Sequence, residues 1–168
     1  MRLVILAAFL PAFLAAALTA APALADCTDP PDPEVNWQGC NFNGLTLTEL
    51  NLEGARLREA SFLRADISGS NLRGIEGYKM RMVSAKAREV DFEGAALPRA
   101  DFTKADLTGA NLAGADLRNA RLYQTVLRDA NLTGAKLGGA DLAQADLTGA
   151  TWIDGERTCR EGSIGRCF

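Results

Sequence analysis

Carboxylates are the residues of this 168-residue chain whose type and spacing could support acid–base chemistry. Paired carboxylates transfer protons when their environments drive their pKa values apart. Seven aspartates stand at separations that are multiples of five: Asp66, Asp91, Asp101, Asp106, Asp116, Asp141 and Asp146. Asn71 and Asn131 stand in the same phase, and an amide shares the acceptor oxygen of a carboxylate but not its acid–base chemistry. The pattern therefore predicts a structural role for these aspartates.

The other residue types that carry catalysis or bind metals are poorly represented. The chain has no histidine, which removes the usual general base and the commonest metal ligand. Its serines have no histidine or evident lysine partner to activate them. The glycine-rich piece 134–139 lacks the GxxxxGK[ST] pattern of a phosphate loop, and the nonapeptide of calcium-binding β-helices is absent. We therefore expect a protein that is not an enzyme and has no cofactor or metal.

A five-residue period without insertions runs from Val35 to Asp154. In this 24-unit run the central residue is large and apolar in 22 units, for example Leu107, Leu112 and Leu117. The residue two positions earlier is Ala in 15 units, the residue between them is Asp or Asn in 13, and the last residue is Gly in 11. Such self-similarity is typical of a solenoid, whose coils bury their apolar faces against their neighbours.

Neither regular secondary structure accounts for this period. Five residues of α-helix advance about 500°, so the leucines would spiral around the axis. In a flat strand an odd repeat would send alternate leucines to opposite faces. The period fits a chain that runs briefly extended, with the central residue and the small residue both inward, and then turns a corner at Asp or Asn and Gly. Four corners would close a square coil of 20 residues, giving six coils.

Units such as 105–109 (ADLTG), 110–114 (ANLAG) and 145–149 (ADLTG) resemble the A(D/N)LxG units of pentapeptide-repeat proteins. The resemblance implies an all-β fold, a right-handed quadrilateral β-helix. The repeat weakens between Ile75 and Val90, where Gly77 and Ala87 are small central residues while Met80 is larger than the usual Ala. Either larger neighbours fill the space that the small residues leave, or a local bulge interrupts the wall.

Residues 1–25 are predicted to be a secretory signal peptide, with Arg2 followed by an apolar stretch and by Ala23-Leu24-Ala25. An uncleaved anchor is one alternative, because residues 3–25 carry no charge. Lipidation at Cys27 is another, although Asp26 stands where that motif needs a small residue. We expect export to the periplasm or secretion, with no stable membrane insertion after cleavage.

Segments outside the repeat are expected to close its ends. Residues 26–34 form a proline-rich N-terminal cap and residues 155–168 a C-terminal cap, while Trp37 and Trp152 are central residues that could plug the end coils. Six coils would separate Cys40 from Cys159 by roughly 28 Å, far beyond the ~7 Å that a disulfide allows between α-carbons. The sequence therefore predicts two disulfides in an oxidising compartment, Cys27–Cys40 and Cys159–Cys167.

One wall is a candidate interaction surface. The residue after each central one should face outward, and at 20-residue spacing one wall presents Asn43, Leu63, Val83, Thr103, Tyr123 and Ala143. Leu63, Val83 and Tyr123 form an apolar line in this column. Arg81 and Arg121 flank the line, and Tyr78 stands on the adjacent wall. Apolar patches rimmed by charge often mark protein contacts, although scattered exposed apolar residues are also ordinary. We expect an unknown protein partner or self-association through this wall.

Net charge separates the functional alternatives. The best-known activity of the resembled family is protection of type II DNA topoisomerases by an acidic rod that mimics duplex DNA. Residues 35–154 hold 15 acidic and 14 basic residues, a net charge of −1, and the acids of residues 26–34 place the acidity at one end. Such a rod does not reproduce the charge density of DNA. The sequence favours a non-catalytic exported scaffold or protein-binding module over a DNA mimic or a cell-wall or glycan-binding module, and no nucleic acid partner is expected.

Overall fold

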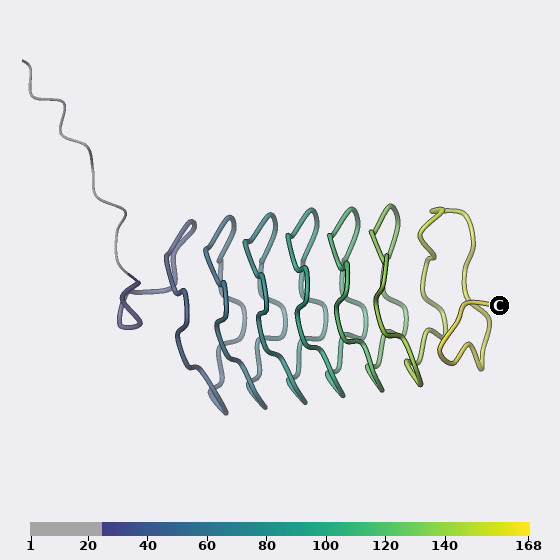
Figure 1. Cartoon of the computed structure of the whole chain (residues 1–168), viewed down its shortest axis with the longest axis horizontal. Coiled ribbons are helices and arrows are strands. Elements are labelled where there is room, and N and C mark those ends of the chain that lie inside the picture. The colour runs from purple at the N-terminus through teal and green to yellow at the C-terminus, as the bar shows by residue number, and fades with distance from the viewer. Residues whose placement is uncertain (1–24) are drawn as a thin grey trace, which may run out of the picture.

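A computed structural model describes residues 25–168, and these residues form a straight stack of coils along one axis (Figure 1). Neither helices nor strands of more than one residue occur in this part of the chain. Instead, single-residue parallel bridges join positions 20 residues apart, from Asn36↔Arg56 to Asn131↔Thr151. Six coils of 20 residues result, which we number from residues 35–54 to residues 135–154. The predicted register is confirmed.

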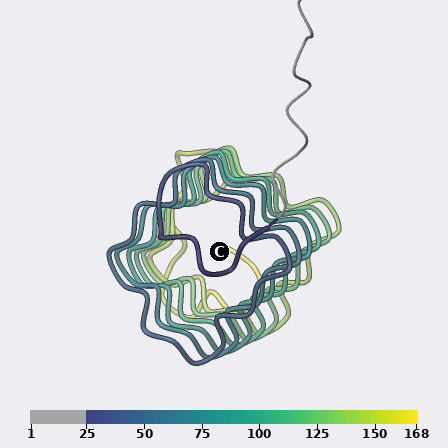
Figure 2. The same ribbon diagram turned by 90° about the vertical axis from the view of Figure 1, so that its left-hand side faces the viewer.

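Viewed along the axis, the coils superpose as a nested square (Figure 2). Each coil has four walls, which we number 1 to 4 in chain order. Each wall is defined by its first bridging residue. Wall 1 begins at Asn36, wall 2 at Asn41, wall 3 at Thr46 and wall 4 at Asn51, and each wall recurs at 20-residue intervals. Within a wall, one bridging residue precedes one central residue and two turn residues.

The corners are hydrogen-bonded turns. In a typical unit the Ala110 N–H donates to the Leu107 carbonyl over 3.0 Å, and Gly109 between them has φ +69°. A positive φ at the third residue of such a turn is the signature of type II. The last residue of every unit from 39 to 149 has a positive φ, and 12 of these 23 residues are not glycine, for example Arg99 at +60°. Asp and Asn lie in the bridge before the turn, one step earlier than the predicted corner.

Main-chain hydrogen bonds hold successive coils together. The Leu107 N–H donates to the Val126 carbonyl of the next coil over 2.8 Å, and the Asp106 N–H donates to the Ala85 carbonyl of the preceding coil over 2.9 Å. This alternation recurs on all four walls. Every inner coil is therefore bonded on both sides.

The interior is filled as the period predicts. Central Leu107 and small Ala105 are both fully buried, and the same holds for most units of the inner coils. Where a hydroxyl replaces Ala, it binds the main chain: the Thr125 hydroxyl donates to the Phe102 carbonyl over 2.8 Å. The two inward positions per unit are confirmed.

The weak segment of the repeat keeps the regular wall. Bridges continue through Glu76, Arg81 and Lys86, so there is no bulge. A Cβ at Gly77 would lie 2.7 Å from Leu97 Cδ2, because the leucine of the next coil occupies that space. Volume exchange between neighbours is therefore the correct interpretation.

The N-terminal segment crosses the end of the first coil (Figure 2) and is attached to it. Cys27 is bonded to Cys40, with 5.5 Å between their α-carbons, and the Trp37 indole N–H donates to the Asp29 carbonyl over 3.2 Å. Trp37 is 3% exposed, whereas Leu45 on the uncovered side of the same coil is 48% exposed. The cap closes part of this end.

The C-terminal segment folds back antiparallel on the last coil, with Thr151 bridged to Thr158 and Asp146 to Ile164. Cys159 is bonded to Cys167, with 4.9 Å between their α-carbons. Trp152 packs against the core and is half-buried. Both disulfides have the pairing expected from the sequence.

Truncation of a central leucine should cost more in an inner coil than in the last one. Leu107 is fully buried, so Leu107→Ala should lower the free energy of unfolding by about 2–5 kcal/mol through lost burial and a residual cavity. Leu137 in the last coil is only partly buried, so Leu137→Ala should cost clearly less. Urea unfolding followed by circular dichroism measures both, and equal losses would contradict the packing described above.

Candidate functional site

Wall 2 carries the predicted apolar line. Leu63, Val83 and Tyr123 follow the central residues of coils 2, 3 and 5, and each residue is partly buried. Arg81 and Arg121 are bridging residues of the same wall and are exposed. The structure thus brings these five predicted residues together on one face.

Tyr78 belongs to wall 1 and lies among cations. The Arg58 guanidinium carbon and the Lys79 ammonium nitrogen lie 5.1 and 5.2 Å from its ring centroid, within the range of cation–π contacts. Arg99 donates to the Tyr78 hydroxyl over 3.4 Å. The ring is therefore covered by basic side chains, and it contributes to the charged part of the surface more than to the apolar line.

A groove of about 480 Å³ runs along the corner between walls 1 and 2. Its lining comprises Lys79, Arg81, Arg99, Asp101, Asn119 and Arg121. Four cations thus share one lining carboxylate, and its contact with Arg121 is long, at 3.6 Å. Lys79 and Arg99 were not predicted from the sequence. They are the last residues of wall 1 in their coils, whereas the predicted patch lies along wall 2. Reading the two adjoining columns of this corner together at 20-residue spacing would have found them.

Charge is divided between the walls. Walls 1 and 2 hold ten basic and five acidic outward residues, a net charge of +5, whereas walls 3 and 4 hold four basic and ten acidic ones, a net charge of −6. The basic residues of walls 1 and 2 are Arg56, Arg58, Arg64, Lys79, Arg81, Arg99, Lys104, Arg118, Arg121 and Lys136. The acidic residues of walls 3 and 4 are Glu49, Glu53, Asp66, Glu89, Asp91, Glu93, Asp106, Asp129, Asp146 and Asp154.

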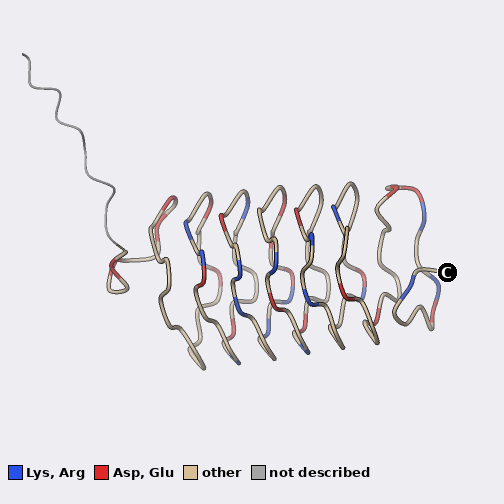
Figure 3. Ribbon diagram, viewed as in Figure 1, with Lys and Arg blue, Asp and Glu red and all other residues tan. Residues whose placement is uncertain are grey.

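This division corrects the expectation that acidity is confined to one end. Charged residues are spread over the length of the solenoid (Figure 3). Counted by wall, the two signs separate across the axis rather than along it. The net charge of the repeat is near zero although two walls are net positive and two are net negative. Residues of one wall are 20 apart in the chain, so a net charge summed over consecutive residues averages all four walls.

The aspartates of wall 3 bind their own main chain. Asp106 Oδ1 accepts the Thr108 N–H over 3.1 Å and the Thr108 hydroxyl over 2.6 Å, while Oδ2 accepts Arg88 Nε of the preceding coil over 2.6 Å. Burial acts to raise the pKa of Asp106, but these hydrogen bonds together hold it below its ordinary value. Asp146 repeats the arrangement with Thr148 and a 2.6 Å contact from Arg128, and its pKa is lowered in the same way.

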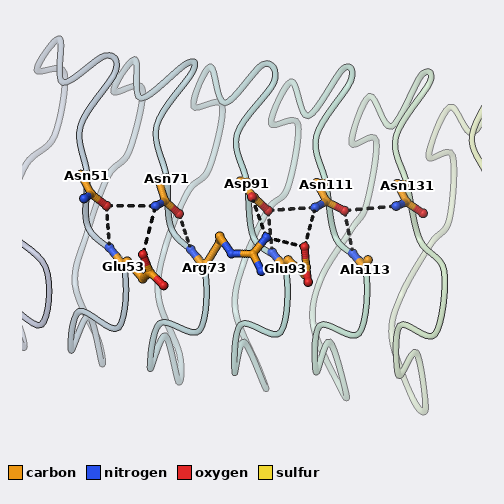
Figure 4. Close-up of polar contacts among 9 residues, drawn as sticks. All are labelled: Asn51, Glu53, Asn71, Arg73, Asp91, Glu93, Asn111, Ala113 and Asn131. Atoms are coloured by element: carbon orange, nitrogen blue, oxygen red, sulfur yellow. Dashed lines mark hydrogen bonds and ion pairs between the residues drawn. The ribbon is translucent and has the colours of Figure 1, made fainter.

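Wall 4 carries an amide ladder along the axis (Figure 4). The Asn71 amide N–H donates to Asn51 Oδ1 over 3.0 Å, and Asn131 donates to Asn111 in the same sense over 3.2 Å. Between them stands Asp91, whose carboxylate accepts from Asn111 over 2.9 Å but has no N–H to continue the ladder toward Asn71.

Arg73 bridges this interruption (Figure 4). Its guanidinium donates to Asp91 over 3.2 Å and also to Glu93. The hydrogen bond from Arg73 is the main cause that lowers the pKa of Glu93. The acceptor capacity of these carboxylates is therefore used within the wall, which agrees with the structural role predicted for the aspartate positions.

The square coil and the outward columns define an all-β protein, a right-handed quadrilateral β-helix with four outer walls. The chain matches the family model for pentapeptide repeats in eight copies, over residues 36–74, 88–124 and 125–151. It therefore belongs to the pentapeptide-repeat family, whose members are generally non-catalytic. The gap between the matched segments falls where Gly77 and Ala87 occupy central positions.

Solved structures of the same family resemble the chain. HetL, involved in heterocyst differentiation regulation in the cyanobacterium Nostoc sp. strain PCC 7120, is 32% identical, with 73% of this chain and 64% of HetL covered and a TM-score of 0.46. A trypsin-treated form of QnrB1, a plasmid-mediated fluoroquinolone resistance protein, is 21% identical, with 71% and 65% covered and a TM-score of 0.54. The chain spans just under two thirds of each. No curated protein matches it.

Residues 25–168 also show whether side chains gather to hold a metal ion and whether a helix could span a membrane. This part of the chain has no group of three or more His, Cys, Asp or Glu side chains arranged to hold a metal ion. It also has no helix with the length and apolar character needed to cross a membrane. The predicted signal peptide, residues 1–25, lies almost entirely outside the described residues.

The wall 3 aspartates should make stability sensitive to acid. Their folded-state pKa values lie below those of the unfolded chain, so their contribution is present above about pH 4 and is lost as the pH falls through the folded values. We expect Asp106→Asn with Asp146→Asn to flatten the fall of the urea midpoint between about pH 4 and pH 2. Asp129→Asn with Glu89→Gln removes two charges from the same wall as a control. An unchanged slope in the first variant would contradict this assignment.

Proposed function

We propose that the chain is a non-catalytic protein-binding module that docks its partner on wall 2. The observation that carries this proposal is the column of Leu63, Val83 and Tyr123, which is partly exposed beside the basic groove. Apolar side chains supply contact area to a partner, and a basic margin favours partners of complementary charge. This is the function that the outer surface supports best.

The rigidity of the wall favours such a role. The main chain around each outward residue of the column is bonded to both neighbouring coils. The Val83 carbonyl accepts the Arg64 N–H of the preceding coil over 3.0 Å, while Met82 and Ser84 donate to carbonyls of the next coil over 2.7 and 2.9 Å. A partner therefore meets a surface that requires little main-chain ordering, which reduces the entropic cost of binding.

Two other functions are supported less well. A DNA mimic needs dense negative charge along the rod, whereas walls 1 and 2 are net positive and the acids of walls 3 and 4 bind Arg73, Arg88 and Arg128. The likeness to QnrB1 concerns the fold alone. A glycan site needs exposed aromatic faces, whereas Tyr78 is covered by cations and only Tyr123 is left on this surface.

Export to the periplasm, or secretion, is part of the proposal. Support comes from the predicted signal peptide and from the cysteines, all four of which are paired in disulfides. Disulfides persist in oxidising compartments.

Photo-crosslinking in the native cell tests the docking wall. A photoreactive residue at position 83, between the two, should give a discrete adduct with a partner protein. Leu63→Glu with Tyr123→Glu should reduce the yield of that adduct at least about tenfold, since a buried charge opposes docking. Ala113→Glu with Thr133→Glu, in the matching column of wall 4, is the control for added charge. Equal adduct yields from the two double variants would refute the assignment, provided that both have the wild-type circular dichroism spectrum.

A further inference from the structure

The two signs of charge are concentrated at diagonally opposite corners of the square. The basic corner lies between walls 1 and 2 and comprises Lys79, Arg81, Arg99 and Arg121. The acidic corner lies between walls 3 and 4 and comprises Glu49, Glu89 and Asp129. Because the walls follow one another in chain order, these corners face away from each other across the axis.

The charges at both corners are available to a partner. No ion pair within the described residues involves Arg81, Arg99 or any member of the acidic corner, although Arg99 donates to the Tyr78 hydroxyl. Arg121 has only the 3.6 Å contact with Asp101, and Lys79 only a 4.0 Å contact with Glu59. Arg88 and Arg128 of wall 3 lie beside the acidic corner, but Asp106 and Asp146 hold them at 2.6 Å. The acidic corner therefore keeps its negative charge.

The two corners also share a period of two coils. On wall 2 the bridging column reads Arg81, Asp101, Arg121, Asp141 from coil 3 to coil 6. In the last column of wall 3, which adjoins wall 4, the acids occupy coils 1, 3 and 5, and the intervening residues are glycines: Gly69, Gly109 and Gly149. Asp66, Asp106 and Asp146, in coils 2, 4 and 6, belong to the bridging column at the other edge of wall 3. Two coils correspond to about 10 Å along the axis at both corners.

This alternation permits attraction without like-charge contacts. If a second rod lies alongside, sliding it along the axis brings its carboxylates opposite Arg81 and Arg121. In that position no carboxylate of the corner faces Asp101 or Asp141, because glycines occupy the alternate coils. A column with an acid in every coil would lack this property.

We propose that the occupant of the basic corner is a second copy of this chain, seated through its acidic corner. This inference rests on the proposed function and names the partner of the same surface. The contact is heterologous, because each copy presents a different corner to its two neighbours, so the association is open-ended and produces rows of rods. The pairs are exposed to solvent and therefore weaken as salt is added.

Sedimentation velocity of the purified chain tests this inference. In 10 mM salt the weight-average sedimentation coefficient should rise with protein concentration, and in 300 mM salt it should return to the monomer value. Arg81→Glu with Arg121→Glu should weaken the association at least about tenfold, and Glu89→Lys with Asp129→Lys should do the same. Arg56→Glu with Lys136→Glu changes the net charge by the same amount as the first variant, away from both corners, and should associate like the wild type.

Mixing the variants gives the decisive measurement. An equimolar mixture of the two corner variants should regain the association that each lacks alone, because acidic corners of one then meet basic corners of the other. A monomeric wild type in 10 mM salt, an effect of the control equal to that of the corner variants, or a mixture that stays monomeric would overturn the inference. If one corner variant has lost its wild-type circular dichroism spectrum, the other variant and the salt series decide.

The two proposals fail separately. Suppose that Leu63→Glu with Tyr123→Glu abolishes the adduct formed from position 83, while sedimentation shows no dependence on charge. Wall 2 would then remain the docking surface of a different protein, and the second copy would be rejected.

Discussion

The hydrogen-bond ladder between coils is the constraint on which the whole molecule depends. A single 20-residue coil cannot bury its own leucines, and apart from the hydrogen bonds that close its turns its main-chain groups find partners only in the coils above and below. The ladder also holds residues in a left-handed conformation that they would not adopt alone. Arg99, at φ +60°, donates its N–H to the Arg118 carbonyl over 3.0 Å, so the turn is fixed from outside the unit. Strain of this kind persists where the surrounding structure over-determines it.

The interior was predictable because the residues of each five-residue unit determine which of its side chains point inward. A central leucine and an alanine two residues earlier define an inward pair, and the interval to the next pair determines where the chain turns. That reasoning needed no knowledge of distant contacts, and it gave the register, the six coils and the separation of the two disulfides. At Gly77 the sequence left two alternatives, volume exchange or a bulge. The side chain that fills the space belongs to Leu97, which is 20 residues away, and its rotamer cannot be deduced from the five-residue period.

The surface was predictable only in part, for the opposite reason. Leu63, Val83 and Tyr123 were found because one column was followed at 20-residue spacing. Lys79 and Arg99 belong to the neighbouring wall and meet Arg81 across a corner, a proximity that a single column does not contain. The distribution of charge was predicted wrongly for a related reason, because only the net charge summed along the chain was considered. A sum over the chain averages four walls, and each wall is a different surface.

The outward positions accept many residue types, even though bridging side chains such as Asp106 and Asp146 stabilise their own turns, and this tolerance lets the walls differ from one another. The turn and the ladder use main-chain atoms, so a bridging or turn residue can be Arg, Asp or Tyr without altering the coil, as Arg81, Asp101 and Arg121 show within one column. Charges that are independent of the core can be sorted onto opposite sides while the total stays near zero. Such sorting gives the rod an electrostatic direction across its axis, which orients an approaching partner before contact. In a protein built from one repeated unit, the differences between walls are therefore where specificity can reside.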